Sequence, residues 1–574
     1  MLITIIDHFT KKSRVLNKNN NLNETYIIFS SAKVMIIQGE NMYKRTVCLF
    51  TALCLTFSFV IYRIISLNYS DYSTADGGNA TRTLTVGSSR GIIYDVNMKK
   101  LVNDTEKKIA VALPGADSIA AIEKMTDEEN ADNIISTLSD GFPCMFETET
   151  SSDCEEIEVF DVPVRYSDNQ PASNIIGYLD NEGKGAFGIE KAFDSILSDA
   201  QGELSVTVTV DANGKMLGGI SPVINNNNFS SPEGVVLTID KDIQLVAEKA
   251  MQKIGSGGCV VLDCSDGRIS AMVSTPALNP DNLAESLTDI NKPFVNKALS
   301  AYSVGSVFKP ILTAYALENN MNIEEFECKG SIRVSDTVFG CINRNPHGKI
   351  GLAESLQVSC NSFYINLTKD IDPERLSSFC SNFSFGTGIT LADGIYAADG
   401  YLPDAKELEN SGSRANFSFG QGKLTATPLQ MAAAYNALVN GGYYKYPYLI
   451  AGTVDAEGKL TQTKRKPHSK ILSESTSRKM RQLLESVVTE GNAYYGEALS
   501  CTCGGKTGTA QSGSYNYNHE EILRTWFVGF FPASDPLYVV AVVNENGVSG
   551  GKDCGPVFSS IADGVMELLI DRAN

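Results

Sequence analysis

Ser306 and Lys309 lie one helical turn apart, a spacing that could support nucleophilic catalysis. A serine hydroxyl becomes a good nucleophile only when a base accepts its proton. The chain has 4 histidines and none stands in a pattern that suits this role, so Lys309 is the candidate base. Burial and a second cation, for which Lys506 is the candidate, would lower its pKa. Alone, such a serine–lysine pair is common on surface helices without function.

Ser359 and Asn361 form a second candidate group, directly before an apolar stretch that predicts a helix. The Ser359 hydroxyl could relay a proton between Lys309 and a leaving amine. The Asn361 amide both donates and accepts hydrogen bonds, so it could hold the lysine and a substrate amide. By itself the triplet indicates little, because turns are rich in such residues.

The run Lys506-Thr507-Gly508-Thr509 lies in a strand-like segment and could bind an extended substrate by main-chain hydrogen bonds. Gly508 leaves room for the substrate backbone. Lys506 and the hydroxyls of Thr507 and Thr509 suit a terminal carboxylate. The N–H groups of Ser306 and Thr509 would form an oxyanion hole. The alternative is a plain edge strand with a blocking lysine.

Strands at both ends of the catalytic part, with helices between them, must position these residues. The pattern predicts an antiparallel sheet assembled from distant segments, an α+β design. The expected elements are a hairpin over 258–273 with its turn at Asp266-Gly267, a helical middle over 305–440, strands at 504–511, 525–531 and 538–544, and a closing helix over 556–571.

Thr46 to Tyr62 is an uncharged apolar run between Arg45 and Arg63, which predicts one short transmembrane helix. Lys44 and Arg45 precede it, so the positive-inside rule leaves the N-terminus in the cytoplasm. No small-residue cleavage site follows soon after, which favours an uncleaved anchor over a signal peptide.

The chain divides by composition into four parts. An asparagine-rich, linker-like stretch at 219–234 marks the main boundary. Residues 1–41 have a poor pattern of apolar and polar residues, and we expect translation to start at Met42. The alternative is that residues 1–41 form a disordered cytoplasmic tail. The predicted parts are the leader 1–41, the cytoplasmic start and anchor 42–67, a β-rich domain 68–230 and the catalytic domain 231–574.

As a set, the three motifs resemble those of the class B, monofunctional penicillin-binding proteins. Further similar segments are Phe419–Gly422, Thr427–Gln430, Trp526–Phe530, Glu545–Gly547, Ser89–Gly91 and Gly188–Glu190. The resemblance implies a penicillin-binding transpeptidase fold: an antiparallel sheet flanked by helices plus a helical subdomain. It also implies an N-terminal β-rich pedestal and a single membrane anchor.

The resemblance implies a peptidoglycan D,D-transpeptidase, a serine-type acyltransferase of wall synthesis in cell shape or division. Ser306 would attack the penultimate D-Ala carbonyl of a stem peptide, and a neighbouring stem would accept the acyl group. β-Lactam antibiotics would acylate the same serine. No metal or organic cofactor is implied. Glycosyltransferase motifs are lacking, so we expect a separate membrane glycosyltransferase as partner, and a catalytic domain outside the cell membrane.

Two other functions remain open. The first is a D,D-carboxypeptidase or β-lactamase-type hydrolase, in which water replaces the amine acceptor. The second is a non-catalytic β-lactam sensor, which would need more spans or an output domain. The net charge of −19 argues against nucleic acid as a partner, because phosphate binding requires a basic surface.

One residue departs from the family pattern, since Cys360 stands where the motif usually has Asp. A Cys341–Cys360 disulfide could tie a loop to the active site and make activity depend on redox state. Cys328–Cys341 is a competing pair, and Cys360 as a small spacer is the plain alternative. Cys501 and Cys503 lack partners for a zinc site, so no metal is expected.

Overall fold

The computed structural model describes residues 50–62, 72–74, 80–515 and 517–574. The chain divides into two compact units. The first holds the residues up to 83 together with 207–223, and the second holds 84–206 and 224–574. In the first unit, β1 (Tyr72–Thr74) pairs antiparallel with the beginning of β2 (Ala80–Ser89). The predicted leader 1–41 lies outside the described residues.

Residues 50–62 are helical, and the large apolar side chains of this helix are exposed, among them Phe50, Leu55 and Phe57. Within the described ranges, no helix combines the length and the apolar character that crossing a membrane requires. Residues 46–49, the beginning of the predicted span, lie outside those ranges.

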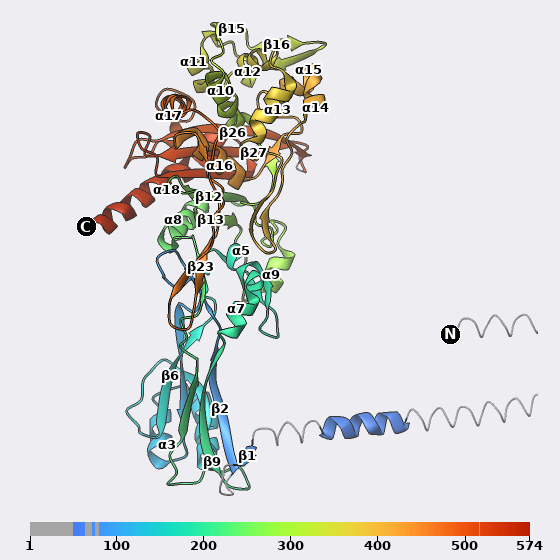
Figure 1. The fold of residues 1–574 in the computed structure, drawn as a ribbon. Coiled ribbons are helices and arrows are strands. Elements are labelled where there is room, and N and C mark those ends of the chain that lie inside the picture. Colours follow the sequence, from blue (N-terminus) through green and yellow to red (C-terminus); the bar gives the residue numbers. More distant parts are fainter. Residues whose placement is uncertain (1–49, 63–71, 75–79, 516) are drawn as a thin grey trace, which may run out of the picture. The chain divides into compact units, whose positions relative to one another are not determined.

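A five-stranded sheet forms the centre of the second unit, in the order β13-β12-β28-β27-β26 (Figure 1). All neighbouring strands are antiparallel. The strands are β12 (Gly257–Asp263), β13 (Ile269–Thr275), β26 (Gly504–Tyr515), β27 (Glu521–Phe531) and β28 (Tyr538–Gly547). The prediction of one antiparallel sheet built from both ends of the domain is therefore confirmed, and β26 is an outer strand.

Helices cover this sheet because its central strands are apolar on both faces. Tyr538 to Val543 of β28 are all buried, as expected of a strand that is packed on both sides. The packing helices are α8 (Lys241–Met251), α16 (Pro428–Val439), α17 (Glu474–Thr489) and α18 (Gly550–Ala573).

The closing helix α18 begins at Gly550, earlier than the predicted start at Pro556. Proline is favoured in a first turn, which made Pro556 look like the beginning. In the structure Gly550 packs on the backbone of Gly508 and Trp526, where a Cβ atom would overlap the carbonyl oxygens of both residues. This close approach depends on tertiary packing, so the local pattern did not reveal it.

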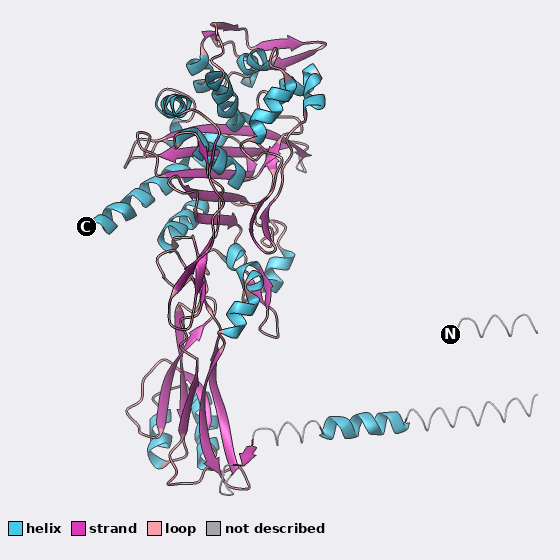
Figure 2. Cartoon of the chain, viewed as in Figure 1, coloured by secondary structure: helices cyan, strands magenta, loops and turns pink. Residues whose placement is uncertain are grey.

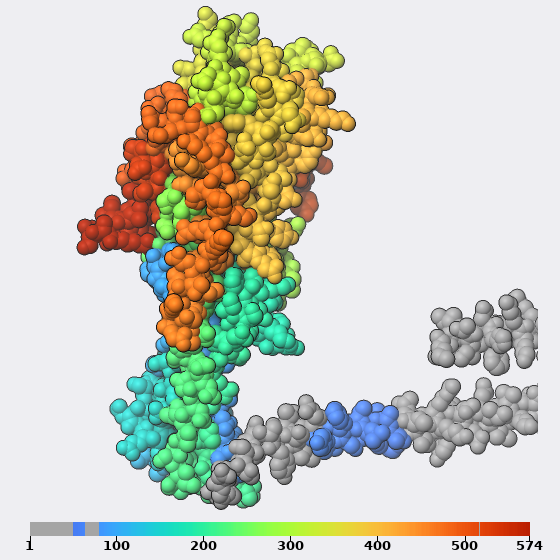
Figure 3. Space-filling model, in the orientation of Figure 1, coloured from blue at the N-terminus to red at the C-terminus, as the bar shows by residue number. Residues whose placement is uncertain are grey.

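A helical subdomain follows the first hairpin, as predicted, but it also contains short strand pairs that the sequence analysis missed (Figure 2). In the space-filling view it forms the yellow-green to yellow surface (Figure 3). Its main helices are α10 (Lys309–Glu318), α11 (Leu352–Gln357), α12 (Asn361–Thr368), α13 (Pro373–Ser381) and α15 (Ser411–Phe417). The strand pairs are β15 (Phe326–Cys328) with β18 (Gly348–Ile350), β16 (Ser331–Val334) with β17 (Thr337–Gly340), and β19 (Ile389–Ala392) with β20 (Ile395–Ala397).

Residues on both sides of position 230 share one sheet. Strand β3 (Ile92–Tyr94) pairs in parallel with β11 (Gly234–Leu237), which also pairs with β23 (Ile450–Val454). Before this junction, β4 (Thr105–Ala112) lies between two antiparallel neighbours, β5 (Cys144–Thr148) and β6 (Ile157–Val164). Helices α3 (Ala116–Ile122) and α4 (Glu128–Ser139) contribute to a separate small apolar core with this sheet.

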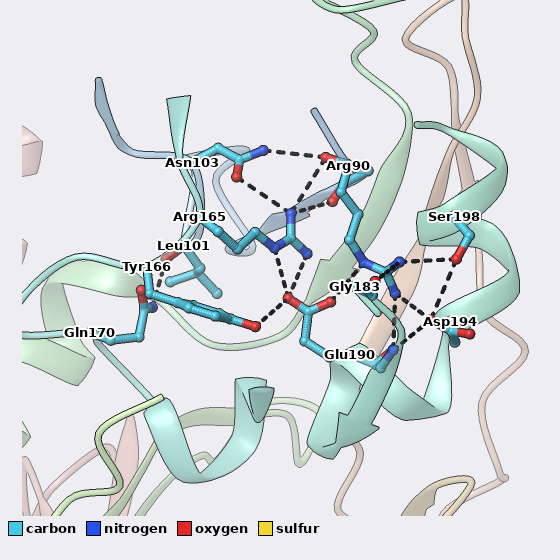
Figure 4. A network of polar contacts seen from close by, with 12 residues as sticks. Arg90, Leu101, Asn103, Arg165, Tyr166, Gln170, Gly183, Glu190, Asp194 and Ser198 are labelled. Atoms are coloured by element: carbon cyan, nitrogen blue, oxygen red, sulfur yellow. Dashed lines mark hydrogen bonds and ion pairs between the residues drawn. The ribbon is translucent and has the colours of Figure 1, made fainter. Parts of the chain in front are cut away.

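A buried ion-pair network joins the two N-terminal segments on which the resemblance rested (Figure 4). The Glu190 side chain is fully buried, and its carboxylate accepts hydrogen bonds from Arg90 Nε at 3.0 Å and Arg165 Nε at 2.7 Å. The Tyr166 hydroxyl donates to the same carboxylate at 3.1 Å, and burial beside this charge raises the pKa of Tyr166. Arg90 also pairs with Asp194 at 2.6 Å. Each charge is therefore compensated.

Candidate active site

Ser306 is half-buried in a 3-10 turn, Gly305–Phe308, directly before α10. Gly305 has φ 60°, and its N–H donates to the Gly420 carbonyl at 2.8 Å. A Cβ atom on Gly305 would lie 2.8 Å from the Thr509 carbonyl oxygen, and one on Gly420 would overlap the Gly305 carbonyl. The serine turn is therefore packed backbone to backbone between β26 and the Gly420 loop, which glycine permits.

Two buried aromatic side chains hold the flanks of this turn. Trp526 Nε1 donates to the Ser303 carbonyl at 2.9 Å, and the Tyr435 hydroxyl donates to the Val307 carbonyl at 2.8 Å. The sequence analysis recognised the segment around Trp526 but gave Tyr435 no role. Tyr435 is the one aromatic residue of the fully buried helix α16, and this was the available signal, because a buried hydroxyl requires a partner.

Lys309 is fully buried and meets the second motif directly. Its Nζ atom donates to the Ser359 carbonyl at 2.7 Å, to Ser359 Oγ at 3.0 Å and to Asn361 Oδ1 at 2.7 Å. Burial lowers the pKa of Lys309 to about 7. Near neutral pH the amine thus exists in both protonation states, which is what a proton acceptor for a serine requires.

The second motif is fixed by backbone geometry at the beginning of α12. Ser359 has φ 55°, a left-handed conformation, and Cys360 is the N-cap residue whose Sγ accepts the Phe363 N–H at 3.4 Å. Asn361 Nδ2 donates to the Gly340 carbonyl at 3.0 Å. The Asn361 amide is therefore held on both sides, with its oxygen turned toward the lysine.

Tyr364 is a further residue of the site that the sequence analysis did not identify. Lys309 Nζ lies 5.5 Å from the centroid of its ring, a cation–π distance. Its hydroxyl is 2.7 Å from Thr313 Oγ1. Tyr364 follows Asn361 by one helical turn and so shares its face, which was the available signal.

Lys506 is fully buried on β26, and its Nζ donates to the Thr507 carbonyl at 3.1 Å. Burial and the nearby Lys309 charge hold the pKa of Lys506 well below its usual range. The Thr507 hydroxyl donates to Asn492 Oδ1 at 3.3 Å. The predicted neighbourhood of the two lysines is thus present, and Lys506 is closed off from solvent.

Gly508 and Thr509 form the part of β26 that faces the serine turn. A Cβ atom on Gly508 would lie 3.0 Å from the Val304 carbonyl oxygen, so the glycine permits the close approach of turn and strand. Thr509 is half-buried, and its Oγ1 accepts the Gly550 N–H at 3.4 Å. Solvent therefore reaches this motif mainly at Thr509.

The predicted Cys341–Cys360 disulfide remains a prediction. Both residues are free cysteines in the structure, and their sulfur atoms lie 3.7 Å apart. Cys328, the competing partner, is also 3.7 Å from Cys341. Cys360 faces this cysteine pair rather than Lys309, so the middle residue of the second motif belongs to a different set of contacts from its neighbours Ser359 and Asn361.

Comparison with known proteins places the chain in a family. The family described as penicillin binding protein transpeptidase domain matches residues 257–563. Stage V sporulation protein D of Bacillus subtilis is 32% identical over 417 residues, which cover 68% of this chain and 61% of the relative. Penicillin-binding protein PbpB of Mycolicibacterium smegmatis is 28% identical over 82% of this chain and 74% of its own length. The chain thus spans less than two thirds of the first relative.

Solved structures show the same fold. The D,D-transpeptidase domain of a peptidoglycan glycosyltransferase from Eggerthella lenta aligns with a TM-score of 0.60 and 22% identity, covering 84% of this chain and 99% of that domain. Penicillin binding protein 3 of Mycobacterium tuberculosis, in complex with aztreonam, aligns with a TM-score of 0.61 and 22% identity, covering 86% and 97%. The family match over residues 257–563 includes all five strands of the central sheet. The chain therefore belongs to the penicillin-binding protein transpeptidase family.

Proposed function

We propose that this chain is a serine-type peptidoglycan D,D-transpeptidase. The observation that carries the proposal is the set of contacts from Lys309 to Ser359 and Asn361, next to the Ser306 turn. Ser306 Oγ attacks the penultimate D-Ala carbonyl of a stem peptide while Lys309 accepts its proton. The peptide bond to the last D-Ala then breaks, and Lys309 and Ser359 return a proton to the leaving amine. The amine of a second stem peptide takes the acyl group and frees Ser306.

Substrate binding in this proposal uses the outer strand of the sheet. An extended stem peptide pairs with β26 beside Thr507 and Thr509, and the N–H groups of Ser306 and Thr509 hold the developing oxyanion. Two observations support it: β26 is an outer strand, and the serine turn packs directly against Thr509. Lys506 is fully buried and donates to the Thr507 carbonyl, so it supports the strand rather than making a solvent-exposed contact with the substrate.

The names of relatives point to the same chemistry. Proteins from Acinetobacter baumannii and Escherichia coli that are 26% and 24% identical to this chain are named peptidoglycan D,D-transpeptidase MrdA. Penicillin binding protein 3 of Mycobacterium tuberculosis has been solved with ampicillin as well as aztreonam. From these names we infer that stem peptides are the substrate of this chain and that β-lactams acylate Ser306.

The proposal includes a membrane-bound arrangement. Residues 68–230 act as a pedestal for the catalytic domain 231–574, and the span Thr46–Tyr62 anchors the chain with its N-terminus in the cytoplasm. The exposed apolar side chains of the helix at 50–62 support an anchor. A separate membrane glycosyltransferase supplies the glycan strands, and residues 1–41 precede the start at Met42.

Labelling with fluorescent penicillin tests the proposed nucleophile. The wild-type chain should form a long-lived covalent adduct, and Ser306→Ala should form none because the attacking oxygen is gone. Ser378→Ala, at an exposed serine of the same subdomain, is the matched control and should label normally. Equal labelling of Ser306→Ala and wild type would refute the assignment.

Product analysis separates the transpeptidase from a hydrolase. With a stem-peptide donor and an added amine acceptor, the transpeptidase should release D-Ala and form the amide product. Release of free acid alone, or rapid hydrolysis of penicillin, would establish a carboxypeptidase or β-lactamase. An adduct without any D-Ala release would establish a sensor.

A further inference from the structure

Four side chains from distant points of the helical subdomain meet beside the second motif. Cys328 ends β15, Cys341 follows β17, His347 precedes β18 and Cys360 caps α12. Their ligand atoms all lie within 4.8 Å of one another. The three cysteines are buried, and His347 is half-buried at the edge of an exposed loop. None of the four belongs to the hydrogen-bond system of Lys309.

We propose that Cys328, Cys341, His347 and Cys360 bind a zinc ion in a tetrahedral Cys₃His site. Around Zn²⁺ with the usual bond lengths, the tetrahedral edges are about 3.8 Å between two sulfurs and about 3.5 Å between sulfur and nitrogen. The sulfur pairs Cys328–Cys341 and Cys341–Cys360 are both 3.7 Å apart, and Cys328 Sγ lies 3.3 Å from His347 Nδ1. Three of the six ligand pairs are therefore already at these distances, and the remaining pairs lie within 4.8 Å.

Hydrogen-bond donors surround the sulfur atoms, as a thiolate site requires. The Gly330 N–H donates to Cys328 Sγ at 3.4 Å, and the Phe363 N–H donates to Cys360 Sγ at 3.4 Å. Ser362 Oγ lies 3.4 Å from Cys341 Sγ. Donors of this kind orient metal ligands and favour their deprotonated form. Each of the three sulfurs thus has one polar neighbour outside the cluster.

Zinc accounts for the cluster more completely than a disulfide does. Cys341 lies equally close to Cys328 and Cys360, so a bond to either would leave one buried thiol and the imidazole without a function. A zinc ion uses all four ligands, and three thiolates with Zn²⁺ leave only one negative charge. This inference replaces both the expected absence of a metal and the redox pairing. The wide spacing of the ligands, unlike a short Cys-x-x-Cys pair, concealed the site in the sequence.

The ion would also position the second motif. Cys360 stands between Ser359 and Asn361, and both of these contact Lys309. Zinc would tie the β15–β18 strand pair and the β16–β17 hairpin to the beginning of α12, in a region whose short strands bury little surface. Structural zinc sites contribute folding energy in this way. This positioning role, unlike the site itself, rests on the proposed function.

Metal analysis of the full chain, purified reduced and without chelators, tests the site directly. We expect about one zinc per chain, and Co²⁺ substitution should give the intense visible absorption of a tetrahedral thiolate site. Cys328→Ala and the less buried His347→Ala should each weaken zinc affinity at least about tenfold, measured by competition with a chromogenic chelator. Cys380→Ala removes an equally buried cysteine of the same subdomain outside the cluster and should keep the zinc. A folded, reduced wild-type chain that binds no zinc at micromolar concentrations, or a Cys341 disulfide in the purified protein, would overturn the site.

A second arm tests the positioning role. Removal of zinc by a chelator should slow the labelling of Ser306 by fluorescent penicillin about tenfold or more, and added Zn²⁺ should restore it. Zinc binding with unchanged labelling would overturn the positioning role alone. A chain that binds zinc but is never labelled would overturn the proposed function and leave the zinc site established.

Discussion

Lys309 Nζ donates to Asn361 Oδ1 at 2.7 Å, and this contact joins the helix that begins beside Ser306 to the beginning of α12. The lysine is fully buried, and its hydrogen-bond acceptors among the described residues are a carbonyl, a hydroxyl and an amide oxygen, none of them a carboxylate. Neutral acceptors hold the amine without stabilising its charge as strongly as an acid would. This explains how the lysine can be fixed in place and still lose its proton near neutral pH.

The pH dependence of acylation should follow Lys309. Burial lowers its pKa to about 7, and only the neutral amine accepts the Ser306 proton. The rate constant for acylation by a fluorescent penicillin should therefore rise as pH increases through about 7 and level off above it. Stopped-flow or gel-based labelling over this range measures the profile, with circular dichroism and zinc content recorded at each pH. A rate that stays flat across this range in folded protein would contradict Lys309 as the base.

Asn361→Asp should shift this profile toward higher pH. The new carboxylate would lie at hydrogen-bond distance from Lys309 Nζ and stabilise the charged amine, raising its pKa by about 1–3 units. Labelling near neutral pH should fall at least about fivefold and recover partly in alkaline buffer. Asn361→Ala is the matched variant, because it removes the contact without adding charge. If the two variants had the same pH profile, the electrostatic explanation would fail.

Gly420→Ala should displace the serine turn. Gly420 has φ 78°, and a Cβ atom there would overlap the carbonyl oxygen of Gly305, which precedes Ser306. Labelling should fall about tenfold or more, and the melting temperature should decrease. Gly458→Ala provides the control, because Gly458 has the same φ of 78° but open space around its Cβ position. The Gly458→Ala variant measures the backbone strain alone, a loss of about 1–2 kcal/mol in the free energy of unfolding, without the steric effect. Equal labelling defects in both variants would count against the packing argument.

Glu190→Gln should destabilise the chain without removing the nucleophile. The buried carboxylate compensates Arg90 and Arg165, so its loss leaves buried positive charge and should cost about 3–5 kcal/mol. Thermal unfolding measures the effect, and labelling of the protein that remains folded should persist. Glu182→Gln breaks only the exposed pair with Lys184 and serves as the control, with no measurable change expected. An unchanged melting temperature for Glu190→Gln would show that the network contributes little.

Much of the catalytic part followed from local sequence. Ser306 and Lys309 could be recognised as a pair in the sequence, because helical spacing fixes which side chains share a face. The strands that became β12, β13, β26, β27 and β28 were readable from alternating or continuous apolar runs between turn residues. The Asp266-Gly267 turn was found as predicted. These features depend on neighbours in the chain, and neighbours are visible in a sequence.

Other features depended on residues that meet only in the folded chain. Tyr435 supports the serine turn from a distant helix, and Gly420 does so from a loop. The meeting of Cys328, Cys341, His347 and Cys360 has the same origin. Their spacing matches no short metal motif, and two strand pairs and a helix end must first fold to bring the ligands together. The sequence by itself therefore determined the chemistry of the three motifs, whereas tertiary packing decided which distant side chains support them.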